Sequence, residues 1–273
     1  MTDDELHRLL DLATSMAREA GALLSDRFSA GGPTQAVTDS IRTKTSRTDL
    51  VTEADHASEQ LVVSRLARER PHDAMLAEEG GARAGTSGLT WVVDPLDGTI
   101  NFVYGFPVFG VSVACRSEAG TLLGVVHDPT RCETFTAVKG GGAFRDGTRL
   151  VLGPGPALGE ALVGTGFSYD SKRRRAQGRL LAHVLPHVRD IRRAGAAAVD
   201  LCWVAAGRLD AHYEAGLAPW DLEAGSLIVT EAGGTVETVP GLLGRDGRSG
   251  ASTLLASAPG LGGPLRDLLE GAP

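Results

Sequence analysis

The sequence has few cysteines, and none of them forms a recognisable pair. Cys115, Cys132 and Cys202 are odd in number, widely spaced and surrounded by apolar or strand-like neighbours. A disulfide framework needs paired cysteines, and structural zinc sites usually contain a CxxC pair. We therefore expect three buried thiols in a reducing compartment, and neither a disulfide nor a zinc site.

Long hydrophobic runs are also absent. No apolar run is long enough to span a bilayer, and the first ten residues, MTDDELHRLL, lack the basic region and the continuous apolar segment of a secretory signal. A hydrophobic content of 42% with a mean hydropathy near zero is typical of a soluble globular protein. We expect a cytoplasmic protein that binds no membrane.

Basic residues are fewer than acidic ones, and the net charge is −7. A general nucleic-acid binder needs a basic surface, so this function is disfavoured. The one basic run, Lys172 to Arg175, is short, and a solvated helix start or loop explains it more simply than contact with an anionic substrate or partner. The GxSxG elbow of serine hydrolases and the GxxxxGK[ST] loop of P-loop proteins are both missing.

No linker-like break, internal repeat or low-complexity tract divides the chain, so we expect a single domain over residues 1–273. Helices and strands mix along the chain, which predicts a layered α/β or α+β architecture. From periodicity and turn residues we predict helices near 3–27, after Thr52, and at 171–188, 196–207, 221–233 and 264–269. The same patterns predict an irregular segment at 30–45 and strands at 74–77, 91–93, 108–115, 122–128, 134–138, 142–152 with a turn at Asp146-Gly147, 160–166, 190–193, 209–214, 235–239 and 253–256.

The most informative stretch is WVVDPLDGTINF, residues 91–102. Its three initial apolar residues predict a buried strand that ends abruptly at DPLDGT. The proline and glycine of this segment are turn residues, so the backbone should bend and bring Asp94, Asp97 and the carbonyl of Leu96 together. Three oxygen ligands would then face one point.

An all-oxygen cluster of this kind suits a hard cation such as Mg²⁺ rather than zinc. Directly after it, the amides of Gly98 and Thr99 could open a helix, whose N-terminus attracts anions. A cation beside an anion cradle indicates a phosphate ester as substrate. The simpler alternative is that Asp94, Asp97 and Asn101 only cap and solvate a loop, because Asp and Asn are ordinary turn residues.

The same stretch carries a family resemblance. WVVDPLDGTINF, followed by VYGFPVFGVSVA, closely resembles the signature of the inositol monophosphatase family of Mg²⁺-dependent, lithium-sensitive phosphatases. Four motifs between the region of Lys44 and the region of Gly234 share the resemblance. It implies an αβαβα sandwich of alternating helix and sheet layers, Mg²⁺ as the cofactor, a small phosphate ester as the substrate, and a homodimer.

The resemblance also implies roles for individual residues. Asp55 would pair with the hydroxyl of Thr99 to help orient the attacking water, and both would act in catalysis together with Glu78. Lys44 would lie on a mobile loop near the metals, and Glu79 would flank the site. The implied metal ligands are Glu78, Asp94, the carbonyl of Leu96, Asp97 and Asp221.

At the leaving-group end, Glu214 in HYEAGL and the segment Gly195-Ala196-Ala197 match positions that contact the inositol ring. One departure from the family pattern is Ala77, where Gly is common; we expect little consequence, because the paired acids after it remain. The residues that the resemblance assigns to substrate binding are Asp97, Gly98, Thr99, Ala197, Glu214 and Asp221.

On spacing alone, the distant acids have simpler roles. Asp55 falls in the first turn of a helix, where an acid complements the helix dipole. Glu78 and Glu79 follow a short strand, and adjacent glutamates are common on surfaces. Asp221 lies at the start of a helix, where the expected role is that of an N-cap. The resemblance, and not the spacing, favours a catalytic site.

The expected reaction is hydrolysis of inositol monophosphate by a metal-activated water. Related phosphatases of the superfamily act on histidinol phosphate, fructose 1,6-bisphosphate, nucleotide 3′-phosphates or NADP, so these substrates remain alternatives. The segment NFVYGFPVFGVSVA is closer to the inositol type than to the histidinol type. A regulatory protein that binds RNA machinery is a distant alternative, supported only by the basic run at 172–175. A metal-dependent nuclease is disfavoured by the acidic charge.

Overall fold

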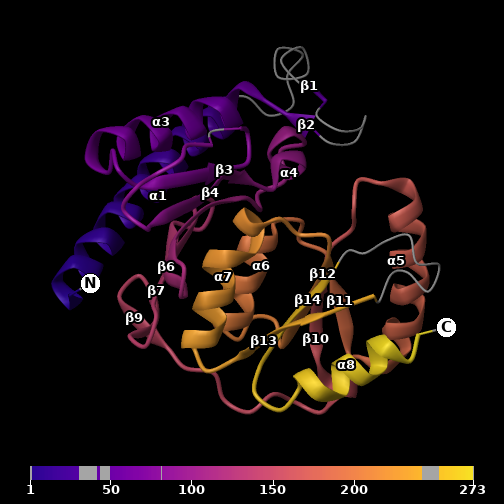
Figure 1. The fold of residues 1–273 in the computed structure, drawn as a ribbon. Helices are drawn as coiled ribbons and strands as arrows, with labels where there is room; N and C mark the ends of the chain where they lie inside the picture. Colours follow the sequence, from indigo (N-terminus) through magenta and orange to yellow (C-terminus); the bar gives the residue numbers. More distant parts are fainter. Residues whose placement is uncertain (1, 31–41, 44–49, 81, 242–251, 273) are drawn as a thin grey trace.

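The computed structural model describes residues 2–30, 42–43, 50–80, 82–241 and 252–272. In these residues, two β-sheets alternate with three layers of helices (Figure 1). Each interface between neighbouring layers is filled by buried apolar side chains. The predicted αβαβα layering is confirmed.

The helix layers draw on distant parts of the chain. The first layer covers the outer face of a seven-stranded sheet, the middle layer lies between the two sheets, and the third covers the outer face of a five-stranded sheet. In layer order the helices are α1 (Asp3–Ala30) and α3 (Glu53–Glu69), then α6 (Ala197–Ala205) and α7 (Pro219–Glu231), then α5 (Ser171–Val184) and α8 (Gly262–Glu270).

Helix α1 packs on the larger sheet through apolar side chains three and four residues apart, as its sequence period predicts. It ends at Ala30 rather than at Arg27. Most of the predicted irregular segment at 30–45, with Lys44, lies outside the described residues. The buried side chains of α1 are Leu9, Ala13, Met16, Ala17, Ala20 and Leu24.

The larger sheet has the strand order β3-β4-β5-β6-β7-β8-β9, and a separate two-stranded pair joins β1 (Arg42–Thr43) to β2 (Leu50–Val51). β3 is parallel to β4, and every later neighbour is antiparallel, which confirms the predicted meander. Its strands are β3 (Ala74–Ala77), β4 (Thr90–Asp97), β5 (Gly110–Ser117), β6 (Gly120–Asp128), β7 (Glu133–Val138), β8 (Gly142–Arg145) and β9 (Thr148–Leu150).

Strand β4 continues further than its sequence predicts. The expected strand covered only residues 91–93, but β4 pairs with β5 as far as Asp97, and its register shifts between Asp94 and Asp97. The bend expected from Pro95 is therefore an irregularity within a strand. An extra residue at such a position redirects the side chains that follow it, so the two aspartates need not point to opposite faces.

The smaller sheet has the order β11-β10-β12-β14-β13. The predicted strand at 160–166 is a 3₁₀ turn, η1 (Leu158–Glu160), followed by a shorter strand, and the predicted helix at 171–188 ends at Val184 and continues as η2 (Leu185–His187). The strands are β10 (Leu162–Thr165), β11 (Asp190–Arg192), β12 (Ala211–Ala215), β13 (Thr235–Val239) and β14 (Thr253–Ser257).

One cysteine contradicts the prediction of burial. Cys115 and Cys202 are buried, but Cys132 is exposed. It lies between β6 and β7, where it adopts a positive φ of 54°. The short polar segment around it forms a turn rather than part of a strand, so its thiol reaches the surface.

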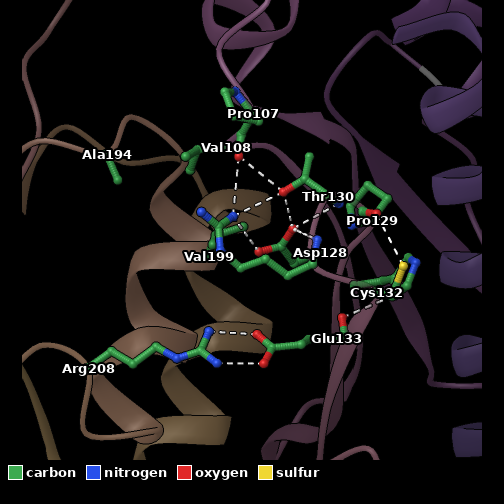
Figure 2. A network of polar contacts seen from close by, with 12 residues as sticks. Pro107, Val108, Asp128, Pro129, Thr130, Cys132, Glu133, Ala194, Val199 and Arg208 are labelled. Carbon is green, nitrogen blue, oxygen red and sulfur yellow. Dashed lines mark hydrogen bonds and ion pairs between the residues drawn. The ribbon is translucent and has the colours of Figure 1, made fainter. Parts of the chain in front are cut away.

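Polar contacts join the segment after α6 to the larger sheet (Figure 2). Arg208, which follows α6, donates two hydrogen bonds to the carboxylate of Glu133 on β7. Nearby, Asp128 at the end of β6 accepts hydrogen bonds from the amides of Thr130 and Arg131, at 3.0 and 3.1 Å.

In the part of the chain that the structure describes, every helix is too short or too polar to span a bilayer.

Candidate active site

Helix α3 meets the short helix α4 (Thr99–Val103) through Asp55 and Thr99. The Thr99 hydroxyl donates a hydrogen bond to Oδ1 of Asp55 at 2.8 Å. Oδ2 of Asp55 accepts from the amide and the hydroxyl of Thr52, at 2.8 and 2.6 Å. Asp55 therefore lies in the first turn of α3, as its spacing predicts, where it also caps the helix, and it contacts the residue that the resemblance pairs with it.

Two more residues of α3 reach the acid-bearing segments, and sequence analysis singled out neither. Ser58 donates a hydrogen bond to the carbonyl of Pro95 at 2.7 Å. Glu59 accepts a hydrogen bond from the amide of Glu79 at 2.8 Å. Their positions three and four residues after Asp55 place them on the same helix face. This spacing could have identified them as candidate site residues from the sequence.

The carboxyl group of Asp94 is buried, with 1% of the residue exposed. Burial raises its pKa well above the usual value, and the carboxylates of Glu78, Asp97 and Asp221 raise it further. Nearby charges act on a pKa in this way only over short distances. The structure therefore brings together four acids that come from three separate parts of the chain.

Asp97 is the last residue of β4, and its side chain faces the N-terminus of α6. Its carboxylate accepts hydrogen bonds from the amides of Ala197, Ala198 and Val199, at 3.0, 2.8 and 3.4 Å. Burial and the charge of Asp221 raise the pKa of Asp97, and the helix amides only partly oppose this shift. The amide of Ala197 thus binds Asp97, and α6 holds Asp97 in one orientation. The substrate contact that the resemblance implies for Ala197 stays a prediction.

The predicted N-cap role of Asp221 is wrong. Helix α7 begins at Pro219 with Ala218 as its N-cap, so Asp221 occupies the third helical position. Its carboxylate accepts a hydrogen bond from the amide of Ala218 at 2.7 Å. Proline suits the first helical position, where an amide would have no partner in the helix, and this preference moves the helix start two residues earlier.

Gly98 and Asn101 fix α4 against the entry to α6. Gly98 has a φ of 94°, and a Cβ added there would lie 3.0 Å from the carbonyl oxygen of Val108 and 3.2 Å from Cβ of Ala196. The side-chain amide of Asn101 donates to the carbonyls of Val108 and Ala194, both at 2.8 Å. Asn101 is buried, so it joins two segments rather than solvating a loop.

The donor set fits a hard divalent cation by its chemistry. Four carboxylates and the carbonyl of Leu96 are all oxygen donors. Burial first, and the neighbouring carboxylates second, raise the pKa values of Asp94 and Asp97, and a bound cation would oppose both effects. Among the described residues, however, no three His, Cys, Asp or Glu side chains already converge as in a metal centre. Asp97 and Asp221 instead bind backbone amides, and the ligand roles stay predictions.

The leaving-group end of the predicted site lies on β12. The carboxylate of Glu214 packs against Gly166, where an added Cβ would approach it to 2.0 Å. Two residues that sequence analysis missed lie between Glu214 and the acids: Asp200 on α6 and His212 on β12, which are 1% and 0% exposed. The period of two along a strand, which places His212 on the face of Glu214, was the signal that could have found it.

Known proteins are similar to this chain over most of its length. The chain matches the model of the inositol monophosphatase family over residues 5–264. It is 42% identical to the inositol-1-monophosphatase SuhB of Mycobacterium tuberculosis strain H37Rv, over 98% of this chain and 95% of that protein. It is 37% identical to the Nus factor SuhB of Escherichia coli strain K12, over 86% of this chain and 87% of that protein.

Solved structures share the fold. The extragenic suppressor protein SuhB from Bartonella henselae superposes with a TM-score of 0.85 at 31% identity, over 97% of this chain and 100% of that chain. The inositol monophosphatase from Anabaena (Nostoc) sp. PCC 7120 superposes with a TM-score of 0.81 at 32% identity, over 98% of both chains. Sequence and fold therefore agree over nearly the whole length. The chain belongs to the inositol monophosphatase family, whose members generally use metal ions, and it is a phosphatase.

Proposed function

We propose that this phosphatase hydrolyses inositol monophosphate, or a closely similar small phosphate monoester, with Mg²⁺ as its cofactor. One observation carries the proposal. Burial raises the pKa of the Asp94 carboxyl, and the carboxylates of Glu78, Asp97 and Asp221 all raise it further. A protein gains nothing in stability from placing three further acids near a buried carboxyl. A site that binds a cation and a phosphate explains the arrangement.

The proposed Mg²⁺ ligands are all oxygens, as this cation prefers. When bound, Mg²⁺ would lower the pKa of a coordinated water, neutralise the ester oxygens and stabilise the leaving alkoxide. The protein's part is to hold these oxygens in place through α3, α6 and α7. The proposed ligands are Glu78, Asp94, the carbonyl of Leu96, Asp97 and Asp221.

The proton pathway is assigned to Asp55 and Thr99. Because the Thr99 hydroxyl donates to Asp55 at 2.8 Å, its oxygen can accept a hydrogen bond from the attacking water and so orient it. As the water loses its proton to this oxygen, the hydroxyl proton of Thr99 passes to the carboxylate of Asp55. Glu78, which is half-buried beside Asp94, would act with them as a positioned carboxylate. The amides of Gly98 and Thr99 would bind the phosphate at the start of α4. No covalent phosphoenzyme is proposed.

The substrate is tested with a panel of phosphate esters. Initial rates with Mg²⁺ are compared for inositol 1-phosphate, histidinol phosphate, fructose 1,6-bisphosphate, adenosine 3′,5′-bisphosphate and NADP. The highest kcat/KM on inositol 1-phosphate supports the proposal, and activity confined to histidinol phosphate overturns the substrate. Asp97→Asn, purified in parallel, shows whether a contaminating phosphatase contributes.

A regulatory role is the second candidate, because a relative carries the name Nus factor. In this chain its support is the basic run Lys172 to Arg175, which forms the exposed first turn of α5 and begins after the N-cap Asp170. This placement also agrees with the solvated helix start that we considered simpler. A cellular role that survives Asp97→Asn would favour regulation over catalysis.

Three further properties are part of the proposal: a homodimer, inhibition by Li⁺, and a cytoplasmic location. Light scattering of the purified protein measures its mass in solution, and a mass corresponding to one chain would exclude the proposed homodimer. Initial rates measured with increasing Li⁺ at fixed Mg²⁺ test the inhibition. Fractionation of cells tests the location.

A further inference from the structure

A buried polar group lies between the middle helix layer and the smaller sheet. Side chains alternate along β12, so Tyr213 contacts the apolar cluster beneath α5 and α8, whereas His212 and Glu214 point toward α6. Asp200, on α6, lies on this side as well, and its charge acts on His212. One imidazole is thus placed with two carboxylates, one of which belongs to the proposed substrate site.

The hydrogen bonding of this group is incomplete. Nε2 of His212 lies 3.3 Å from Oε2 of Glu214, but neither ring nitrogen makes a well-aligned hydrogen bond with a described residue, and Oδ1 of Asp200 has no such partner either. Buried polar groups without partners destabilise a fold. A role in stability alone therefore does not account for them.

The charges of the group favour an imidazolium. Burial by itself lowers the pKa of His212, but Glu214 and Asp200 outweigh burial and raise it. Burial raises the pKa of Asp200 to about 7, while His212 and Arg193 act in the opposite direction. Both carboxylates therefore favour the charged imidazolium of His212, whose Nε2 faces Glu214.

Glu214 is held from two sides. Its carboxylate packs against Gly166, where any side chain would collide with it, and its Oε2 faces His212. Among the described residues, none donates a hydrogen bond to Oε1. This carboxylate is therefore confined between Gly166 and His212, and it retains an oxygen that can accept a hydrogen bond.

Resting on the proposed function, we propose that His212, supported by Asp200, is a positioning residue that holds Glu214 as an acceptor for hydroxyl groups of the leaving alcohol. An acceptor whose charge is compensated attracts a neutral polyol through its hydroxyls but gains little from a cationic amino alcohol. The pair therefore sets a preference for uncharged polyol phosphates over phosphate esters that carry an ammonium or imidazolium group.

The test compares His212→Gln with the wild-type enzyme on three substrates, which are inositol 1-phosphate, histidinol phosphate and 4-nitrophenyl phosphate. The last has no hydroxyl for Glu214 to bind. We expect KM for inositol 1-phosphate to rise about tenfold, which corresponds to one charge-assisted hydrogen bond, with kcat nearly unchanged. The preference for inositol 1-phosphate over histidinol phosphate should fall by a similar factor, and hydrolysis of 4-nitrophenyl phosphate should change less than about twofold.

Two further variants complete the experiment. Tyr213→Phe is the matched control, because this residue is buried on the same strand but faces the opposite side, and it should leave all three activities unchanged. Asp200→Asn preserves size and weakens the support of His212, so it should raise KM for inositol 1-phosphate severalfold. It carries the test if His212→Gln does not fold.

Equal losses on all three substrates, or an unchanged KM for inositol 1-phosphate in both variants, would overturn the positioning role. A wild-type enzyme that hydrolyses neither inositol 1-phosphate nor 4-nitrophenyl phosphate with Mg²⁺ would instead overturn the proposed function. The two failures are therefore distinguishable.

Discussion

The hydroxyl of Thr99 donates a 2.8 Å hydrogen bond to the carboxylate of Asp55, a residue 44 positions earlier in the chain. The same carboxylate caps its own helix through Thr52. Asp55 consequently joins the first helix layer to the segment that carries Asp94 and Asp97. A structural cap and a proposed catalytic contact share one side chain, and the two roles can be separated at Thr99.

Thr99→Val removes the hydroxyl and leaves the cap of α3 in place. If the hydroxyl orients the attacking water, kcat should fall by at least about 100-fold, the usual contribution of a positioned proton acceptor. The free energy of unfolding should fall by only about 1 kcal/mol, the value of one hydrogen bond. Steady-state kinetics and thermal melts measure both, and unchanged kcat would reduce Asp55 to a cap.

Mg²⁺ should stabilise the fold, because it relieves the repulsion among the acids. At about 100 times its Kd, a ligand that binds only the folded state adds about 2.7 kcal/mol. The Tm should therefore rise with millimolar Mg²⁺ in the wild-type protein. Asp94→Asn should lose most of this rise, whereas Asp190→Asn, on the exposed strand β11, should keep it. A Tm indifferent to Mg²⁺ would count against the metal site.

Stability should depend on pH in a direction set by the buried acids. The pKa values of Asp94, Asp97 and Asp200 are all raised in the folded protein. A carboxyl with a raised pKa binds its proton more tightly when folded, so its contribution to stability is complete below its unfolded pKa and is lost as the pH rises through its folded pKa. For Asp200 the loss runs from the usual 3.8 up to about 7.

Without metal, the Tm should therefore fall between about pH 4 and about pH 7, and Asp200→Asn should make this decline shallower. His127, whose pKa is lowered by burial, acts in the opposite sense. His212, whose pKa Glu214 and Asp200 raise against burial, acts in the same sense as the acids, so the variant reports on Asp200 and His212 together. Protons and Mg²⁺ compete for the same carboxylates, and the stabilisation by Mg²⁺ should grow with pH. A decline of equal slope in Asp200→Asn would refute the assignment.

Gly98→Ala should impair activity more than a glycine substitution at a comparable backbone angle elsewhere. Gly98 and Gly147 both have positive φ, 94° and 78°, but only at Gly98 would a Cβ meet other atoms, those of Val108 and Ala196. Both variants should lose about 1 kcal/mol from the strained backbone angle. Only Gly98→Ala should also shift the start of α4 and lower kcat. Equal kcat values in the two variants would show that catalysis does not depend on the exact position of the start of α4.

Local patterns in the sequence predicted much of the fold. The apolar period of α1, the helix α3 after Thr52 with Asp55 in its first turn, and the antiparallel meander are all found in the structure. These features depend on residues close in sequence, whose spacing determines which side chains share a face. The helix start at Pro219 and the exposed Cys132 were predicted incorrectly, because a preference within one turn decided each of them.

The motif around Asp94 and Asp97 by itself identified the family and supplied the chemistry, since oxygen ligands and free amides in one short segment indicate a cation and a phosphate. Only the tertiary structure showed that Glu78 and Asp221 join these residues, that α6 holds Asp97, and that His212 lies beside Glu214. The reason is physical. Sequence spacing determines which way a side chain points along its own helix or strand, but the packing of α6 and α7 between two sheets decides which distant side chains meet.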